Sequence, residues 1–281
     1  MYTEKVKEEL SQVIKACGKY LGGARISLSF EDLRGYLGSF SINGNSKGWS
    51  ASIIKVPIMI EVFNQISQGK LSLEDEIAAN HRYTLEFFDP VSMAPDGTPF
   101  TVKRLLEYMI IRSDNEASNL LADRVGLENI NKTSSRLGAR NTMLAHLLAY
   151  NVPRLYSDFN TDGSNITTAK DMTRLLSAIY TDKAGNRKNC EHMRKLLEES
   201  DSKWLGMFLP KETLIGNKVG LISSPKFGYD IHDVGVINGD YAISIMMNRI
   251  KAKSISPQMA IGALSETVYD FYYKKLRGLE K

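Results

Sequence analysis

The segment Ser52-Ile53-Ile54-Lys55 holds a serine and a lysine whose spacing suits nucleophilic chemistry. Positions i and i+3 of a helix share one face, so the lysine amine can reach the serine hydroxyl. If a helix begins at Ser52, its unpaired N–H groups and the positive end of its dipole lie beside the serine. The pair therefore predicts a nucleophile with a neighbouring base and with donors for the negative charge that its attack creates.

The Ser-x-x-Lys pattern occurs four times in the chain, beginning at Ser52, Ser67, Ser200 and Ser223. Only Ser52 opens a long apolar segment, which continues to Ile66. An ordinary helix N-cap is the alternative role for this serine. The pattern alone does not decide between the two.

Two later motifs favour a reactive serine. Ser113-Asp114-Asn115 lies between two apolar helical runs and predicts either an N-cap or a second hydroxyl beside an amide. Lys218-Val219-Gly220 follows a strand-like segment, where Gly220 would let a strand edge approach a ligand closely. A lysine near a strand end is usually just solvated. One shared site nevertheless accounts for all three motifs more simply than three unrelated structural roles.

In this order, Ser-x-x-Lys, Ser-Asp-Asn and Lys-Thr/Ser-Gly form the signature of class A β-lactamases and penicillin-binding proteins. The sequence resembles that family beyond the motifs, in residues 52–57 and 113–121, and the resemblance covers nearly the whole chain. It implies three catalytic residues: Ser52 as the nucleophile, Lys55 as the acceptor of its proton, and Ser113 as the proton donor to the leaving nitrogen. We expect no cofactor and no metal ion.

The resemblance also implies a substrate-binding set. Asn115 would bind the amide of the acyl side chain, and Lys218 would attract the substrate carboxylate. The oxyanion would meet the backbone N–H groups of Ser52 and Leu221, beside Gly220. Phe87 or Phe88 is a candidate for an aromatic wall of the cleft, although adjacent phenylalanines are more often core residues. The implied partner is a β-lactam or a peptide ending in D-Ala–D-Ala.

The sequence departs from the family where the acyl-enzyme would be hydrolysed. Class A β-lactamases carry an omega-loop glutamate that activates water, but no glutamate occurs between Glu128 and Glu191. The spacing places that position near Leu148, and the nearest carboxylates, Asp158 and Asp162, follow ten or more residues later. Loss of a positioned general base typically costs about 10²–10⁴-fold in rate. We therefore expect slow release of an acyl group.

A second departure is Val219, which stands where the family has Thr or Ser. It removes a hydroxyl that helps to hold the substrate carboxylate, a loss on the order of 1 kcal/mol. Three hypotheses remain open: a serine hydrolase acylated by β-lactams with slow turnover, a DD-carboxypeptidase or transpeptidase, and a sensor domain that reports β-lactams by becoming acylated. Val219 weighs somewhat against the peptidase.

Composition agrees with an ordinary globular enzyme. The 281 residues carry a formal charge of +4, and no basic cluster is interleaved with aromatics, which argues against nucleic-acid binding. No apolar stretch is long enough to span a bilayer. Residues 1–20 are charged and show no signal peptide, so the chain acts in the cytosol or has lost an export segment. We expect a monomer, with Cys17 and Cys190 as free thiols.

Hydrophobic periodicity predicts an α/β protein of the α+β type. Residues 1–43 and 201–281 are expected to form a five-stranded antiparallel sheet flanked by helices, and residues 44–200 an inserted all-helical domain. The strands are predicted at 24–30, 35–42, 213–219, 232–238 and 241–248, and the flanking helices at 2–21 and 256–276. The site would lie at the seam, with both serines on the helical side and Lys218 on a sheet edge.

Overall fold

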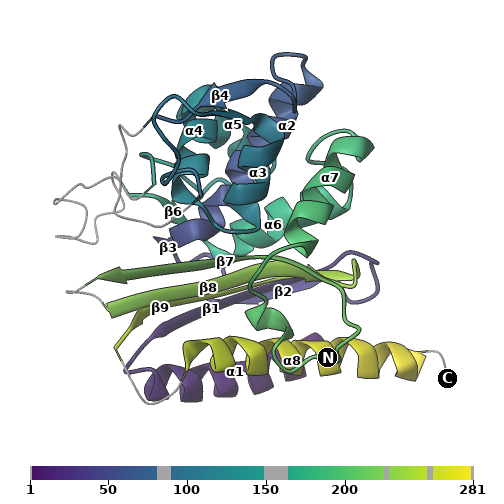
Figure 1. The fold of residues 1–281 in the computed structure, drawn as a ribbon. Helices are drawn as coiled ribbons and strands as arrows, with labels where there is room; N and C mark the ends of the chain where they lie inside the picture. The colour runs from purple at the N-terminus through teal and green to yellow at the C-terminus, as the bar shows by residue number, and fades with distance from the viewer. Residues whose placement is uncertain (1, 81–89, 149–163, 225–227, 252–255, 280–281) are drawn as a thin grey trace.

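An antiparallel five-stranded sheet forms the middle layer of the protein (Figure 1). The computed structural model describes residues 2–80, 90–148, 164–224, 228–251 and 256–279. The strands follow the order β2-β1-β9-β8-β7, and their bounds are β1 Arg25–Asp32, β2 Ser39–Ile42, β7 Ile215–Ser224, β8 Gly228–Ile237 and β9 Tyr241–Ile250. The first and last parts of the chain therefore share one sheet, as the sequence predicts.

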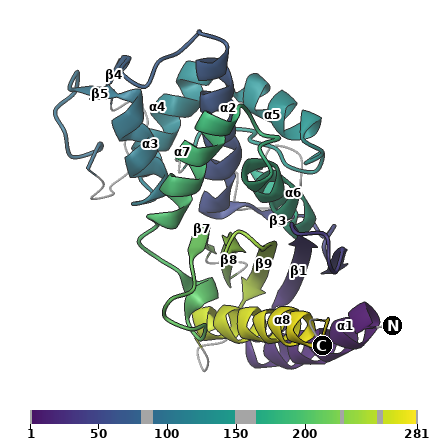
Figure 2. The same cartoon turned by 90° about the vertical axis from the view of Figure 1, so that its right-hand side faces the viewer.

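Helices cover both faces of the sheet (Figures 1 and 2). The helices α1 Tyr2–Tyr20 and α8 Pro257–Leu279 lie side by side below it. The other face carries the remaining helices: α2 Lys55–Ser67, α3 Val102–Ile110, α4 Asn115–Val125, α5 Leu127–Arg136, α6 Ala169–Tyr180 and α7 Arg187–Glu198. The described part of the chain has no helix long and apolar enough to cross a membrane.

Strand β9 shows how the sheet separates two hydrophobic cores. Because successive side chains of a strand point to opposite faces, alternate residues enter different layers. Ala242 and Met246 join the core formed with the upper helices, whereas Ile243, Ile245 and Met247 join the core with α1 and α8. All five are fully buried, so a strand in this position has few polar side chains.

The first hairpin has a wider turn than the predicted one at residues 31–34. Strand β1 continues to Asp32, and β2 does not begin until Ser39. The carboxylate of Asp32 closes the turn, because it accepts hydrogen bonds from the backbone N–H groups of Arg34 at 2.8 Å and Leu37 at 2.6 Å. An aspartate that binds the backbone of its own turn in this way replaces the strand ladder over residues 33–38.

Strand β7 is longer than predicted. The sequence predicts a strand over residues 213–219, but β7 continues to Ser224, which pairs with Gly228. Short pieces of strand also occur within the mainly helical part: β3 Gly48–Trp49 pairs with β6 Ile166–Thr167, and β4 Glu76–Ala78 pairs with β5 Pro99–Thr101. Two further short elements are the 3-10 helices η1 Ala51–Ile54 and η3 Trp204–Gly206.

Helix α6 is anchored at its first turn. The side chain of Thr168 accepts a hydrogen bond from the N–H of Asp171 at 3.1 Å, so Thr168 is the N-cap of the helix. The buried Asp171 carboxylate in turn accepts from the N–H of Asn141 at 2.6 Å and from the hydroxyl of Thr142 at 3.3 Å. These bonds attach the chain after α5 to the helix that lies on the sheet.

Replacing Asp171 by alanine should lower the free energy of unfolding by about 2–3 kcal/mol, because the half-buried N–H of Asn141 and the buried hydroxyl of Thr142 lose an acceptor and Arg174 loses its ion pair. Urea unfolding of the whole protein measures this change. Glu191→Ala, which removes an exposed ion pair with Arg187, is the matched control and should cost less than about 1 kcal/mol. Equal effects of the two substitutions would contradict a structural role for the buried carboxylate.

Candidate active site

Ser52 lies in a strained turn between strand β3 and helix α2. The residue before it, Ala51, has a φ of +44°, a conformation that a non-glycine residue adopts only at a cost. The predicted α-helix starting at Ser52 is a 3-10 turn, η1, and α2 begins at Lys55. A 3-10 turn of this kind often precedes the first turn of an α-helix.

Strand β7 approaches this turn closely at Gly220. A Cβ atom added to Gly220 would lie 3.2 Å from the Cβ of Ala51 and 3.2 Å from the backbone nitrogen of Ile53. A larger side chain there would push the strand away from the nucleophile turn. The predicted close approach at Gly220 is thus present, and it brings the strand against the protein's own backbone.

The amine of Lys55 is fully buried and is held by the Ser-Asp-Asn segment. Its Nζ donates to the carbonyl oxygen of Ser113 at 2.6 Å, to Ser113 Oγ at 3.2 Å and to Asn115 Oδ1 at 2.7 Å. Among the described residues, Ser52 Oγ makes no hydrogen bond to Lys55 or to any other group. The expected direct contact between serine and lysine is therefore not formed in this structure.

Ser113 stands between two lysines. Its Oγ accepts from Lys55 Nζ at 3.2 Å and from Lys218 Nζ at 2.9 Å. A hydroxyl has two acceptor lone pairs and one O–H donor. With both lone pairs occupied by lysine N–H groups, its proton can be given only to a third group. Ser113 also has a φ of +60°, so a second residue of the site is held in the left-handed region.

The Ser-Asp-Asn motif also contains a helix N-cap, which is Asp114 rather than Ser113. Asp114 begins helix α4, and its carboxylate accepts from the N–H of Ala117 at 2.9 Å and from the N–H of Val91 at 3.1 Å. The three-residue motif therefore combines two tasks. Asp114 fixes the helix start, and Ser113 and Asn115 on either side contact Lys55.

Lys218 is buried rather than solvated, with 1% of its surface exposed. Besides Ser113, its Nζ donates to the carbonyl oxygen of Val219 at 3.0 Å. Burial lowers the pKa of Lys218 to about 7, because desolvation disfavours the charged amine; the negative charge of Asp233 opposes the shift. An anionic group that bound here would stabilise the protonated form. The site therefore has a lysine whose charge depends on pH near neutrality.

Helix α4 also holds the chain at the start of the predicted omega loop. One turn after Asn115, the side chain of Asn119 accepts from the N–H of Leu148 at 2.7 Å and donates to its carbonyl at 3.0 Å. Residues four apart share one face of a helix. Residue 148 thus lies about one helical turn from the amide that binds Lys55. Its side chain is apolar and buried.

Asn165 completes the attachment of this segment. Its side-chain oxygen accepts from the N–H groups of Ala145 at 2.8 Å and His146 at 3.1 Å, and its carbonyl accepts from Ser50 Oγ at 3.0 Å. Neither Asn119 nor Asn165 was singled out from the sequence. A second asparagine four residues after Asn115, on the same face of the predicted helix, is the signal that could have indicated Asn119.

The remaining predicted residues that the structure describes make no contact that adds to the site. Leu221 follows Gly220 on the edge strand, with its side chain 56% exposed. Phe87, Phe88, Asp158 and Asp162 lie outside the described residues. Both cysteines are free, and no group of His, Cys, Asp and Glu in the described ranges could hold a metal ion.

A sequence profile of the beta-lactamase enzyme family matches residues 5–272 of the chain. The chain belongs to this family, whose members are serine hydrolases. It is 25% identical to the beta-lactamase VEB-1 of Pseudomonas aeruginosa, over 97% of this chain and 92% of the relative. Among solved structures, it is similar to a beta-lactamase from Sphaerobacter thermophilus, with a TM-score of 0.80 and 23% identity over 93% of this chain and 95% of the other.

The structure is also similar to PBP-A, including a PBP-A variant with a leucine replaced by glutamate, solved as the acyl-enzyme with penicillin G. For that variant the TM-score is 0.80, with 20% identity over 96% of this chain and 97% of the other. At such identities the structures show a common fold. The α+β architecture with a five-stranded antiparallel sheet is therefore that of the β-lactamase and transpeptidase fold.

The charge of Lys218 gives a pH prediction. If the protonated amine captures an anionic substrate, the second-order rate constant for acylation by benzylpenicillin should fall about tenfold for each pH unit above about 7. The sign follows from the lowered pKa, because Lys218 loses its proton as the pH rises through that value. Stopped-flow or quenched-flow acylation rates between pH 6 and pH 9 measure the profile.

Lys218→Arg supplies the comparison, since a guanidinium keeps its charge throughout this range. Its rate relative to pH 6 should not fall on the alkaline side. An alkaline fall of the same size in both proteins would assign the titration to another group.

Proposed function

We propose that the protein is a serine hydrolase that β-lactams acylate at Ser52 and that releases the acyl group slowly. Ser52 attacks the lactam carbonyl, Lys55 takes the hydroxyl proton, and Ser113 gives a proton to the leaving nitrogen. The strained turn at Ala51 and the close approach of β7 at Gly220 support this assignment, because they place the serine beside an edge strand.

The contacts of Lys55 support its role as base. A protonated lysine has three N–H donors and no lone pair, and three acceptors surround Nζ within 3.2 Å. A neutral amine keeps two donors and gains one lone pair, which can turn to Ser52. Ser113 and Asn115 therefore hold the amine in place while it exchanges a proton. Lys218 and Leu221 bind the substrate carboxylate and the oxyanion in this proposal.

The apolar residue at position 148 is the main support for slow release of the acyl group. The reciprocal bonds to Asn119 hold its backbone one turn from Asn115, and the side chain at this position has no group that can accept a proton. Attack of water on the acyl-enzyme then lacks a base at the place where class A β-lactamases have one. The PBP-A variant described above, in which a glutamate replaces a leucine and penicillin G remains attached, concerns a protein of the same fold.

Intact-protein mass spectrometry tests the acylation step. Benzylpenicillin should add one intact drug mass, and Ser52→Ala should abolish the adduct. Ser223→Ala is a matched control, since it changes an exposed serine in another Ser-x-x-Lys segment and should leave the adduct unchanged. Absence of an adduct on the unaltered protein would contradict the proposal.

The same adduct separates slow from rapid turnover. Persistence over minutes to hours supports slow release, whereas rapid loss would point to an unassigned base such as Asp158 or Asp162. The peptidase alternative predicts release of D-alanine from a synthetic peptide ending in D-Ala–D-Ala. Such release, abolished by Ser52→Ala, would replace the β-lactam assignment by the peptidase one.

Leu148→Glu should accelerate deacylation by about 10²-fold or more, because it places a carboxylate where water attacks. Decay of the benzylpenicillin adduct, followed by mass spectrometry, gives the rate. Leu148→Gln is the control, since it has the same size and polarity change without a base. A rate unchanged by glutamate, or raised equally by glutamine, would show that residue 148 does not face the acyl group.

A further inference from the structure

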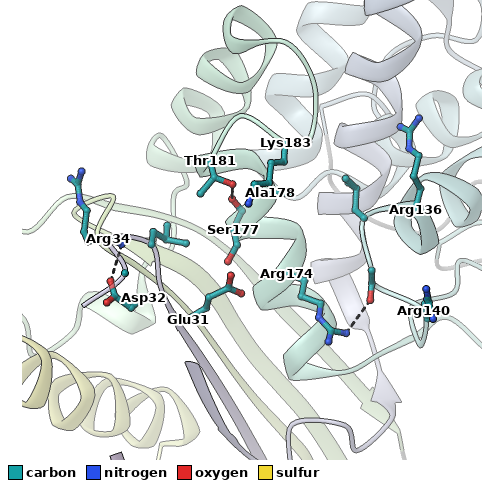
Figure 3. Close-up of a pocket in the computed structure, with 14 residues that line it drawn as sticks. Glu31, Asp32, Arg34, Arg136, Arg140, Arg174, Ser177, Ala178, Thr181 and Lys183 are labelled. Atoms are coloured by element: carbon teal, nitrogen blue, oxygen red, sulfur yellow. Dashed lines mark hydrogen bonds between the residues drawn. The ribbon is translucent and has the colours of Figure 1, made fainter. Parts of the chain in front are cut away.

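A groove lies at the edge of the sheet opposite to the site just described. Lys218 lies on the edge strand β7, whereas this groove opens beside the β1–β2 turn and is walled by the end of α5 and by α6 (Figure 3). Its volume is about 840 Å³, within the range of small-molecule sites. The residues that line it do not take part in the proposed reaction.

Cationic side chains dominate the lining. Arg34, Arg136, Arg140, Arg174 and Lys183 contribute five positive charges. Two of them are engaged. Arg34 forms an ion pair with Asp240 at 2.8 Å. Arg174 forms an ion pair with Asp171 at 3.6 Å and donates to the carbonyl of Gly138, just after α5, at 3.0 Å.

The remaining three cations have little to neutralise them. Arg136 donates at 3.3 Å to the neutral amide oxygen of Asn64, and Arg140 and Lys183 make no hydrogen bond or ion pair with a described residue through their side chains. Two carboxylates also line the groove, Glu31 and Asp32, and Asp32 accepts hydrogen bonds from the backbone of its own turn. The lining therefore carries three more positive than negative charges, and two of its cations are paired with Asp240 and Asp171 outside it.

The lining also indicates what kind of anion fits. None of its described residues is aromatic, so a nucleobase would find no ring on which to stack. Guanidinium groups bind phosphate oxygens through two parallel N–H donors. The groove is too large for a single small oxyanion to contact residues from α5, α6 and the hairpin together. A compound with several linked phosphate groups would match both the charge and the size.

We propose that this groove binds a non-aromatic polyphosphate, with Arg136, Arg140 and Lys183 as its main ligands. The proposal is independent of acylation at Ser52. The ligand would bridge the β1–β2 turn and the helices α5 and α6, and so would join the sheet to the upper layer.

Isothermal titration calorimetry of the full chain with inorganic tripolyphosphate, at low ionic strength, tests the site. We expect saturable binding that Arg140→Gln with Lys183→Gln weakens by at least about tenfold, because two charge-assisted contacts are lost. The control Lys103→Gln with Lys188→Gln removes the same charge from exposed positions outside the groove. It should leave the affinity within about twofold.

Absence of saturable binding, or an equal loss in both double variants, would overturn the proposal. ATP serves as a second probe with the same triphosphate and an added nucleoside. Equal affinity for both supports the assignment, and markedly tighter binding of ATP would overturn the non-aromatic choice. The rate of benzylpenicillin acylation, measured on the Arg140/Lys183 variant, should equal that of the unaltered protein. Failure of the polyphosphate proposal can therefore be distinguished from failure of acylation at Ser52.

Discussion

The hydroxyl of Ser113 is the point at which three distant parts of the chain meet. It accepts hydrogen bonds from Lys55, which begins helix α2, and from Lys218, which lies on edge strand β7. Both lysines are buried, and a buried amine without polar partners is costly to fold. Ser113 and its carbonyl supply those partners, and its left-handed backbone turns both oxygens toward the amines. The arrangement of helices over the sheet must therefore place residue 113 between the two lysines to within about an ångström.

Strand β7 positions Lys218 because its side chains alternate between the two faces of the sheet and because it has a glycine at position 220. Lys218 and Gly220 are two residues apart, so their side-chain positions share the face of β7 that is turned toward η1. The lysine reaches up to Ser113, and the missing side chain of Gly220 lets the strand approach Ala51. The proposed function adds a reason for β7 to be an edge strand, because a strand paired on both sides would have no free backbone groups to offer a substrate. The position of β7 at the edge of the sheet and the proposed chemistry of the site therefore depend on each other.

How much of this could be predicted from sequence depends on the range of the interaction. The five-stranded sheet and its flanking helices follow from local periodicity. The burial of Lys218 does not, because it depends on Ser113, which is 105 residues away in the chain. Neither does the extension of β7 to Ser224, which depends on its register with β8. The motifs indicated which residues gather, but Lys55 contacts Ser113 and Asn115 rather than Ser52, a choice that only the packed structure fixes.

Two steps of an acyl-transfer reaction place different demands on this architecture. In the proposed reaction, attack on a substrate would use groups that already bond one another in the fold, namely the two buried lysines and the half-buried Ser113 and Asn115. Release of the acyl group in the proposed reaction would need a further base on the segment that Asn119 attaches to α4 and Asn165 holds through residues 145 and 146. Those tethers bind backbone atoms, so they position residue 148 whatever its side chain is. A change of one side chain there can therefore alter the lifetime of an acyl-enzyme while the acylating groups keep their geometry.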